Sequence, residues 1–572
     1  MNFNQLKKNL KKDFTGLKSV KVALLGDTAS QLLAIAIRGQ GFEAGLDVEI
    51  YETDYDLIYE TVINSTDKLY TEKYEYILIF QSTQKLQSNF YKLPLEQRKT
   101  FAAEQKSYLE NLFQIITKNS SAKIISFNFP EINDGVFGNF SSKTKTSFLF
   151  QLRNLNVELQ NIAHSNKNIF IADVLSAVNS AGQKEAMSAK WYITSQNVFQ
   201  LEFLPVVAKI CTDILLAFTG KFKKCLIMDL DNTMWGGIIG DDGLENIEIG
   251  DLGIGKAFTQ LQYWAKELKQ RGILIAVCSK NDEHIAKEVF EKHPDMVLRL
   301  EDISIFVANW SNKGDNIKYI QEVLNIGMDS LVFIDDNPFE RNLVKTMLPD
   351  VTVPELPEDP AEYLPYLQSL NLFETVSFTE EDTVRTKQYQ EESKRVIMQH
   401  SFESVDEYLG SLEMEAKVEP INSFNLARCA QLTQRSNQFN LTTIRYTEDQ
   451  LQQFLATGGK AICISLKDKF GDYGLISLIL LEQKENIAEV NTWIMSCRVL
   501  KRGVEELAVN EIITAAQQMN CDKITGKYLP TAKNGMVKEL YKNMGFVMFS
   551  ENESTLNCQG FDPFKTHIKT SK

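Results

Sequence analysis

Two acidic residues stand two positions apart at the end of a short apolar run, Cys225-Leu226-Ile227-Met228, which leads into Asp229 and Asp231. The run predicts a central strand that brings both acids to the carboxyl edge of an α/β sheet, where such sheets bind ligands. Two acids so close repel each other in a low-dielectric site, and Mg²⁺, which prefers hard oxygen ligands, would compensate them. Asp229 could then attack phosphorus while Asp231 protonates the leaving oxygen. In a simpler interpretation, the two acids only cap the following turn.

Later stretches place more polar side chains at predicted strand ends. The apolar residues 273–278 lead into Ser279, whose hydroxyl can bind a phosphate oxygen without adding charge. Lys313 can neutralise the charge that develops on phosphorus, and a further strand over 331–334 ends in Asp335 and Asp336. A single serine or lysine is usually a surface group, and it is the repetition that favours a site.

The elements around these residues alternate between strand and helix. A helix is predicted over residues 256–270, ended by Gly272 before the strand that leads to Ser279. The glycine-rich stretch 234–243 predicts a tight turn and a hairpin beside the two acids. We therefore expect this segment to form a parallel sheet with helical crossovers.

The composition of the whole chain predicts several soluble domains. At 572 residues the length suggests roughly three to four domains. The formal net charge of −14 and the lack of a basic tract argue against a partner that is nucleic acid or an anionic membrane.

No targeting or membrane segment is evident in the sequence. The amino terminus has lysines but no apolar core of signal-peptide length, and no stretch approaches the roughly 18 apolar residues of a membrane span. Eight dispersed cysteines without a C-x-x-C pair suit reduced thiols, and five scattered histidines do not suggest a zinc site. We expect a cytoplasmic protein.

The first segment predicts a doubly wound α/β domain. Strands are expected at 20–28, 48–51, 76–80, 123–127 and 169–171, with helices between them at 106–116 and 152–163. The first strand ends in the turn Gly26-Asp27-Thr28.

The last third of the chain follows a proline-rich connector, with prolines at 349, 354, 357, 360 and 365. A charged stretch over 379–396 predicts an exposed helix. Strands are then expected at 461–466, 474–481 and 487–495, followed by a helix over 504–519, which indicates an α+β domain.

The residues at the strand ends resemble the four motifs of the haloacid dehalogenase (HAD) superfamily of phosphotransferases, in order, type and placement. The resemblance implies that Asp229 becomes phosphorylated, that Asp231 is the acid/base, and that Ser279 and Lys313 hold the phosphate. It also implies a Mg²⁺ site that Asp335 and Asp336 complete together with Asp229 and the carbonyl of Asp231. The resemblance leaves open which of the two late acids contacts the metal.

The gaps between the first three motifs are too short for the cap domains that many HAD enzymes insert there. An uncapped core of this type can admit a large substrate, or neighbouring domains can roof it.

Longer strings are similar to the FkbH-like branch (subfamily IIIC): M-D-L-D-N-T-M-W-G-G-I-I-G-D-D-G from Met228, V-C-S-K-N from Val277 and F-I-D-D-N-P from Phe333. That resemblance implies transfer of a glyceryl unit from 1,3-bisphosphoglycerate, a phosphorylated three-carbon acid, to an acyl carrier protein, with loss of phosphate. The alternatives are a plain phosphatase acting on a small phosphorylated metabolite and a scaffold that docks a carrier protein.

The outer segments carry weaker resemblances. Gly26-Asp27-Thr28 resembles the nucleophile turn of SGNH hydrolases, but Thr28 replaces serine and His164 lacks the D-x-x-H context, so we expect a non-catalytic domain. The last segment resembles a GNAT acyltransferase. Arg498, Arg502 and Gly503 would then receive either coenzyme A or a carrier's phosphopantetheine, with Glu505 as an unfavourable acid near a pyrophosphate; alternatively this basic helix start only packs on the body.

The predicted organisation is therefore multidomain α/β. It comprises an SGNH-like domain (1–220), an uncapped HAD-like core (221–353), a connector with an exposed helix (354–413) and a GNAT-like α+β domain (414–572).

Overall fold

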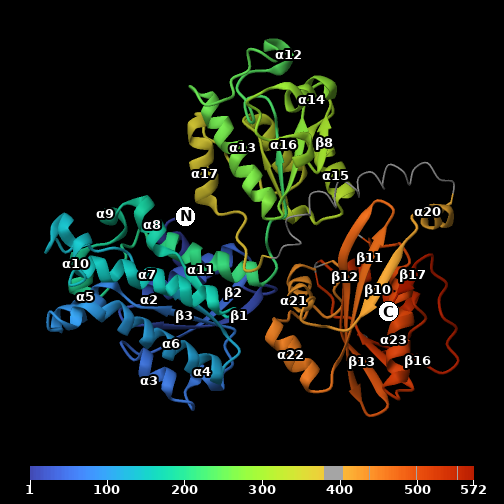
Figure 1. Cartoon of the computed structure of the whole chain (residues 1–572), viewed down its shortest axis with the longest axis horizontal. Coiled ribbons are helices and arrows are strands. Elements are labelled where there is room, and N and C mark those ends of the chain that lie inside the picture. The colour runs from blue at the N-terminus through green and yellow to red at the C-terminus, as the bar shows by residue number, and fades with distance from the viewer. Residues whose placement is uncertain (379–403, 437, 497–498, 532, 551, 572) are drawn as a thin grey trace. The chain divides into compact units, whose positions relative to one another are not determined.

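The computed structural model describes residues 1–378, 404–436, 438–496, 499–531, 533–550 and 552–571. The chain divides into two compact units, Met1–Leu216 and Ala217–Lys572, and the second unit contains two separate sheets (Figure 1). The predicted exposed helix over 379–396 lies outside the described residues, and the domain limits taken from the sequence stay a prediction.

The first unit is built on a parallel five-stranded sheet in the order β2-β1-β3-β4-β5, which confirms the doubly wound α/β prediction. Strand order reverses at β1, as in flavodoxin-like folds. The strands are β1 Lys18–Gly26, β2 Leu46–Glu52, β3 Tyr76–Phe80, β4 Lys123–Phe127 and β5 Ile169–Ala172.

Helices cover this sheet because its strands are apolar on both faces. On one face, helices α3 (Ile58–Ile63), α6 (Phe101–Asn119) and α7 (Phe148–Ser165) share a buried cluster with β1, β3 and β4. Helix α2 (Gln31–Glu43) packs on β2 and on α1 (Phe3–Asn9), and it needs glycine for both contacts. A Cβ at Gly39 would lie 2.3 Å from the Leu6 carbonyl oxygen, and one at Gly41 would lie 2.4 Å from Val48 Cγ2. The other helices are α4 Lys68–Thr71, α5 Thr83–Lys92, α8 Val174–Ala181, α9 Gln183–Ala186, α10 Ala189–Ser195 and α11 Leu204–Phe218.

The turn after β1 is used to join strands. Both carboxylate oxygens of Asp27 accept from the amide of Ser82, at 2.9 and 3.0 Å, which ties the end of β1 to the end of β3. Thr28 is buried at this carboxyl edge of the sheet. His164 lies exposed in the last turn of α7, which leads into the amino end of β5, so it is at the opposite edge from Thr28.

The sheet that carries the predicted acids is parallel, in the order β8-β7-β6-β9. Its strands are β6 Cys225–Met228, β7 Leu274–Ser279, β8 Ile305–Ala308 and β9 Leu331–Ile334. Helices α13 (Gly255–Gln270), α14 (Glu283–Lys292) and α17 (Tyr363–Leu370) pack on one face, and α15 (Lys313–Leu324) and α16 (Pro338–Met347) on the other. We call strands β6–β9 with helices α13–α17 the central core.

The hairpin that we expected over 234–243 is not formed. The described structure there has a one-turn helix, α12 (Ile239–Asp242), and a single antiparallel bridge. Side chains take the backbone amides that a hairpin ladder would use: the amide of Ile239 donates to the carboxylate of Asp231 at 3.1 Å.

The beginning of the proline-rich connector belongs to the central core. Leu356, Tyr363, Leu367 and Phe373 are buried in the same cluster as Met228. The chain therefore still contributes packing to this core after the last predicted acids.

The C-terminal sheet is mixed, in the order β15-β16-β14-β13-β12-β11-β10-β17, which confirms an α+β arrangement. Its strands are β10 Glu415–Glu419, β11 Lys460–Asp468, β12 Gly471–Lys484, β13 Ile487–Met495, β14 Lys523–Lys527, β15 Val547–Ser550, β16 Glu553–Asn557 and β17 Lys569–Ser571. Helix α23 (Val504–Gln518) packs on one face of this sheet, and α21 (Leu426–Arg435) and α22 (Glu448–Ala456) pack on the other. The other described α-helices of the C-terminal part are α20 (Val405–Ser411) and α24 (Leu540–Asn543). None of the described helices is long and apolar enough to cross a membrane.

The packing of α17 yields a testable prediction. A chain that ends at residue 378 should keep the central core as stable as in the full chain, whereas one that ends at 353 loses its four buried apolar side chains, each worth about 1.5–3 kcal/mol. Thermal unfolding can be followed by tryptophan fluorescence, to which Trp264, whose ring packs against Phe373, contributes. Equal stability of the two shortened chains would contradict this assignment of α17.

Candidate active site

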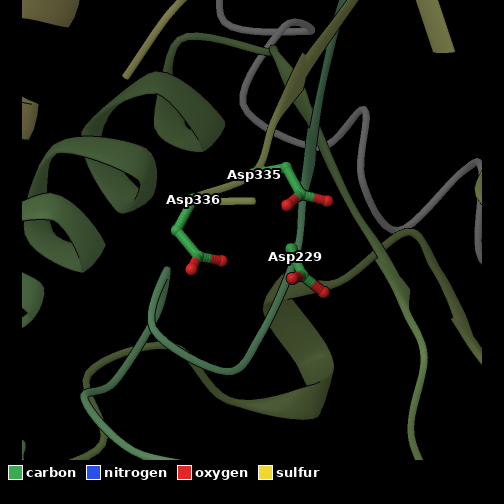
Figure 2. Close-up of side chains that lie close together, drawn as sticks. All are labelled: Asp229, Asp335 and Asp336. Carbon is green, nitrogen blue, oxygen red and sulfur yellow. The ribbon is translucent and has the colours of Figure 1, made fainter. Parts of the chain in front are cut away.

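Three carboxylates meet at the carboxyl edge of the central core (Figure 2). Each of Asp229, Asp335 and Asp336 offers an oxygen, and these oxygens lie within 4.8 Å of one another. The sheet explains the meeting: β6 and β9 are parallel neighbours with Met228 paired to Ile334, so the residues that follow each strand come together. A group of carboxylate oxygens without sulfur or imidazole is the donor set of a hard cation.

Asp229 is positioned for chemistry. Asp229 is 6% exposed, and its Oδ2 lies 2.9 Å from the Lys313 ammonium. The other oxygen, Oδ1, is buried and has no hydrogen-bond partner among the described residues. A buried carboxylate oxygen without a donor is costly, which indicates that a cation or a reacting group occupies this position in the working protein.

Lys313 balances the cluster. It begins α15, is 2% exposed and forms ion pairs with both Asp229 and Asp335. Burial alone would lower the pKa of Lys313, but the charges of the two carboxylates raise it above its ordinary value. The ammonium therefore stays charged beside the two carboxylates.

The two late acids differ in their contacts. Asp335 is completely buried: Oδ2 pairs with Lys313, and Oδ1 accepts from the Asn337 amide at 2.8 Å. Asp336 is half-buried, and its backbone amide donates to the Thr233 hydroxyl at 3.1 Å. Burial, followed by the charge of Asp229, raises the pKa of both acids. Asp336 has the more available carboxylate, while Asp335 is already engaged with Lys313.

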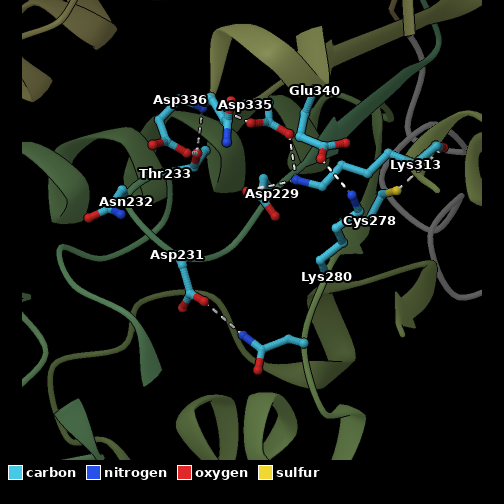
Figure 3. A network of polar contacts seen from close by, with 12 residues as sticks. Asp229, Asp231, Asn232, Thr233, Cys278, Lys280, Lys313, Asp335, Asp336 and Glu340 are labelled. Carbon is cyan, nitrogen blue, oxygen red and sulfur yellow. Dashed lines mark hydrogen bonds and ion pairs between the residues drawn. The ribbon is translucent and has the colours of Figure 1, made fainter. Parts of the chain in front are cut away.

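Asp231 has a different environment (Figure 3). Its carboxylate is outside the group of three. It accepts from the Trp235 indole at 3.0 Å, the backbone amide of Ile239 at 3.1 Å and the side-chain amide of Asn281 at 3.0 Å. Burial raises the pKa of Asp231, although the hydrogen bonds from Ile239 and Trp235 act against it. The backbone carbonyl that we expected to bind the metal stays a prediction.

The residues on either side of Ser279, Cys278 and Lys280, have different surroundings. Ser279 is the last residue of β7 and is 1% exposed. Cys278 is fully buried within the cluster formed by α15 and α16, with its Sγ 3.9 Å from the Lys313 carbonyl oxygen. Lys280 pairs with Glu340 of α16 at 2.6 Å (Figure 3).

Three residues with roles at the site carried no separate prediction. Thr233 links the β6 loop to Asp336, Asn281 holds Asp231, and the buried Arg341 donates to the carbonyl oxygens of Asp335 and Asp336 at 2.8 and 2.6 Å. Thr233 and Asn281 are within the sequence strings quoted above, which was their only signal. Arg341 had none, because its role depends on how α16 starts after β9.

Two of the three predicted binding residues of the C-terminal part, Arg502 and Gly503, lie within the described residues. Arg498 lies outside the described residues. Arg502 is 5% exposed, donates to the Tyr473 hydroxyl and lies 3.9 Å from Asp468, inside the fold. Gly503 precedes α23 with a φ of 81°, and it lines a pocket of about 510 Å³ together with Lys501, Glu505 and apolar side chains. The assignment of Arg502 to a ligand stays a prediction.

Comparisons with known proteins agree with this architecture. The model of the FkbH N-terminal domain matches residues 21–216. The solved N-terminal part of the protein BF1531 from Bacteroides fragilis, which contains a phosphatase domain and is complexed with Mg, is 47% identical; the match covers 66% of this chain and 100% of that one, with a TM-score of 0.64. No curated protein matches.

Solved acetyltransferases match a smaller share of the chain. The spermidine N-acetyltransferase from Vibrio cholerae in complex with CoA and spermine is 14% identical over 25% of this chain and 95% of that one, with a TM-score of 0.20. A GNAT-family acetyltransferase from Staphylococcus aureus is 10% identical over 25% and 99%, also with a TM-score of 0.20. The α+β assignment of the C-terminal part rests on the mixed sheet and helices of this part, not on these matches.

The fold of the central core and the acids at its edge define the class, a phosphatase-type domain of the HAD superfamily. With 47% identity over the whole of the Bacteroides fragilis structure, and with the N-terminal match, the chain belongs to the FkbH-like family. The predicted family is confirmed at this level.

The place of Cys278 predicts an inert thiol. Burial raises the pKa of this thiol above its ordinary value, so the reactive thiolate is scarce at neutral pH and increases only at higher pH. We expect Cys278→Ala to leave phosphate release and any acyl loading within about twofold of the unchanged protein, since isolated conservative changes of this kind act mainly through packing. Loss of loading with phosphate release intact would instead show that loading requires the Cys278 thiol.

Proposed function

We propose that the chain is a Mg²⁺-dependent phosphotransferase that acts on a small phosphorylated substrate through an aspartyl-phosphate. The observation that supports this most directly is Asp229, whose buried Oδ1 lacks a partner while Lys313 and two further acids surround it. Such an arrangement has a nucleophile, a neutralising ammonium and an oxygen-rich metal site at one strand end.

The residues fit Mg²⁺. Oxygen ligands and space for waters are what this cation requires, and the related Bacteroides fragilis structure is complexed with Mg. Asp229, Asp336 and the carbonyl of Asp231 would hold it, and Asp335 would orient Lys313. When bound, the cation would offset the charge of the phosphoryl oxygens.

The protein side chains would carry out two displacements. In the first, a carboxylate oxygen of Asp229 forms a bond to phosphorus, the bond from phosphorus to the leaving oxygen breaks, and Asp231 gives that oxygen its proton. In the second, water attacks phosphorus, Asp231 takes a proton from the water, and the bond to Asp229 breaks. Ser279 and Lys313 would hold the phosphoryl oxygens throughout.

The finer proposal is transfer of a glyceryl unit from 1,3-bisphosphoglycerate to an acyl carrier protein. It is supported by the resemblance of the strings around Asp229, Ser279 and Asp335 to FkbH-like proteins, and by a central core whose motifs are not separated by a cap domain. A plain phosphatase for a small metabolite remains the alternative enzyme.

The pocket beside Gly503 supports a site for the carrier's phosphopantetheine arm. Its volume of about 510 Å³ suits a flexible chain, and Leu540 and Met544 give it an apolar lining. The amide of Lys501 donates to Glu505 at 3.0 Å, so this acid already occupies the helix start where a pyrophosphate of coenzyme A would bind. A carrier arm lacks the adenosine portion and avoids most of that conflict.

We further propose that the first unit binds or positions partners without hydrolysing them, since Thr28 and His164 lie at opposite edges of the sheet. A cytoplasmic location is supported by the cysteines of the described residues, which are buried and unbridged.

The aspartyl-phosphate proposal predicts that Asp229→Asn abolishes phosphate release, a loss of at least about 10²-fold, because the amide is a far poorer nucleophile. The amide keeps one oxygen ligand, so Mg²⁺ binding measured by calorimetry should weaken but persist. Turnover near that of the unchanged protein would refute the assignment of Asp229.

One experiment separates the three candidate functions. The protein is incubated with 1,3-bisphosphoglycerate, Mg²⁺ and a phosphopantetheinylated carrier protein, and the carrier is examined by intact mass while phosphate is measured. A glyceryl adduct on the carrier supports transfer, phosphate release without an adduct supports a phosphatase, and carrier binding that persists in Asp229→Asn without either product supports a scaffold. Omitting Mg²⁺ should stop both reactions.

A further inference from the structure

We propose that Asn281 is a positioning residue that fixes the orientation of the Asp231 carboxylate, so that Oδ2 is the oxygen that exchanges a proton with the substrate. The proposal rests on the phosphotransfer function above. Asn281 is 5% exposed, and its Nδ2 donates to Asp231 Oδ2 at 3.0 Å. Removing this donor would leave one side of the carboxylate without its anchor.

Asn281 is itself held in one orientation. Its Oδ1 accepts from the backbone amide of Asp282 at 3.0 Å, and Asp282 caps the start of α14. Because the side-chain oxygen is occupied by this N–H, the amide nitrogen is the atom that faces Asp231. The helix cap therefore determines which end of Asn281 meets the acid.

The other carboxylate oxygen is already saturated. Oδ1 of Asp231 accepts from the indole of the fully buried Trp235 at 3.0 Å and from the Ile239 amide at 3.1 Å. A carboxylate oxygen has about two lone-pair sites, so these two donors use those of Oδ1, whereas Oδ2 keeps one after Asn281 is bound. The proton given to the leaving oxygen is therefore carried on Oδ2.

Asn281 also couples the acid to the phosphate-binding strand. It follows Ser279 by two residues, at the end of β7, while Asp231 follows β6, which is the parallel neighbour of β7. The hydrogen bond between their side chains thus fixes the acid relative to the residue proposed to hold the phosphoryl oxygens. A small displacement of Oδ2 would lengthen the path of the proton without disturbing the attack of Asp229.

This role makes a specific kinetic prediction. As the bond between phosphorus and the leaving oxygen breaks, the proton moves from Asp231 Oδ2 to that oxygen, and the need for it grows with the basicity of the leaving group. In Asn281→Ala, kcat should fall about 10- to 100-fold for glycerol 2-phosphate, since a positioned acid is worth about 10²–10⁴-fold. For p-nitrophenyl phosphate, whose leaving group needs little protonation, kcat should fall less than about threefold by the same reasoning.

Two variants separate positioning from folding. Asn281→Leu keeps about the same size and loses the donor without adding a charge, so it should show the same dependence on the leaving group. In Asp231→Asn, adding Asn281→Ala should cause no further loss, because both changes remove one function. The matched control is Asn309→Ala, which follows the neighbouring strand β8 and bonds to Asn316 rather than to Asp231; it should behave as the unchanged protein.

A readout independent of turnover completes the test. In protein labelled with ¹⁵N-tryptophan, the indole signal of Trp235 should shift in Asn281→Ala, because the carboxylate that accepts its N–H reorients, and should stay in place in Asn309→Ala. An unchanged Trp235 signal, or an equal loss of kcat for both substrates, would overturn the role of Asn281. Absence of phosphate release in the unchanged protein with every ester would refute the proposed function instead, and the Trp235 signal would still decide the positioning.

Discussion

Repulsion among buried carboxylates is the constraint on which the central core depends. Asp229 and Asp335 are almost fully buried and Asp336 is beside them, so three like charges share a low-dielectric site. Lys313 offsets part of this charge through two ion pairs, and a cation would offset the rest. The surrounding structure resists the repulsion: Arg341 holds the carbonyls that follow β9, and Thr233 receives the Asp336 amide. The packed sheet thus maintains a charge cluster that would separate in water.

The parts of this site that sequence predicted are those set by strand pattern. Asp229, Ser279 and Asp335 each come at or directly after an apolar strand, and parallel neighbours must bring such positions to one edge. The sequence could not predict which late acid has the more available carboxylate, because that depends on the contacts of Asp335 with Lys313 and with the Asn337 amide. It also could not predict that the expected hairpin is absent, since the hydrogen bond from the Ile239 amide to the Asp231 carboxylate depends on the folded conformation of the loop.

Outside the central core, the local sequence pattern predicted the helices and strands better than it predicted the contacts of individual side chains. The five strands of the first unit and strands β11, β12 and β13 of the C-terminal sheet were expected from the sequence pattern and lie where predicted, within a few residues, whereas β10 and β14–β17 were not predicted. Arg502 illustrates the limit of such patterns. Its place beside Gly503 predicts a ligand contact, whereas in the structure its side chain contacts Tyr473 and Asp468 in the interior. Likewise, prolines suggested a linker, but Tyr363 and Leu367 pack into the core. In each case a partner that is distant in the sequence determines where the side chain packs, and a local pattern contains no information about that partner.

The same type of sheet edge carries different chemistry in the two units, and the contrast shows what makes a site. In the first unit Asp27 also follows a central strand, where both of its oxygens accept from the Ser82 amide. Burial raises the pKa of Asp27 to about 7, although this hydrogen bond and the charge of Lys85 act against it. This acid can become neutral, and then it needs no cation. Asp229 instead forms an ion pair with the buried ammonium of Lys313 at 2.9 Å, and its Oδ1 has no hydrogen-bond partner among the described residues. A carboxylate at a strand end is thus a structural link when backbone amides satisfy it, and a candidate nucleophile when it pairs with a buried ammonium and one of its oxygens has no partner.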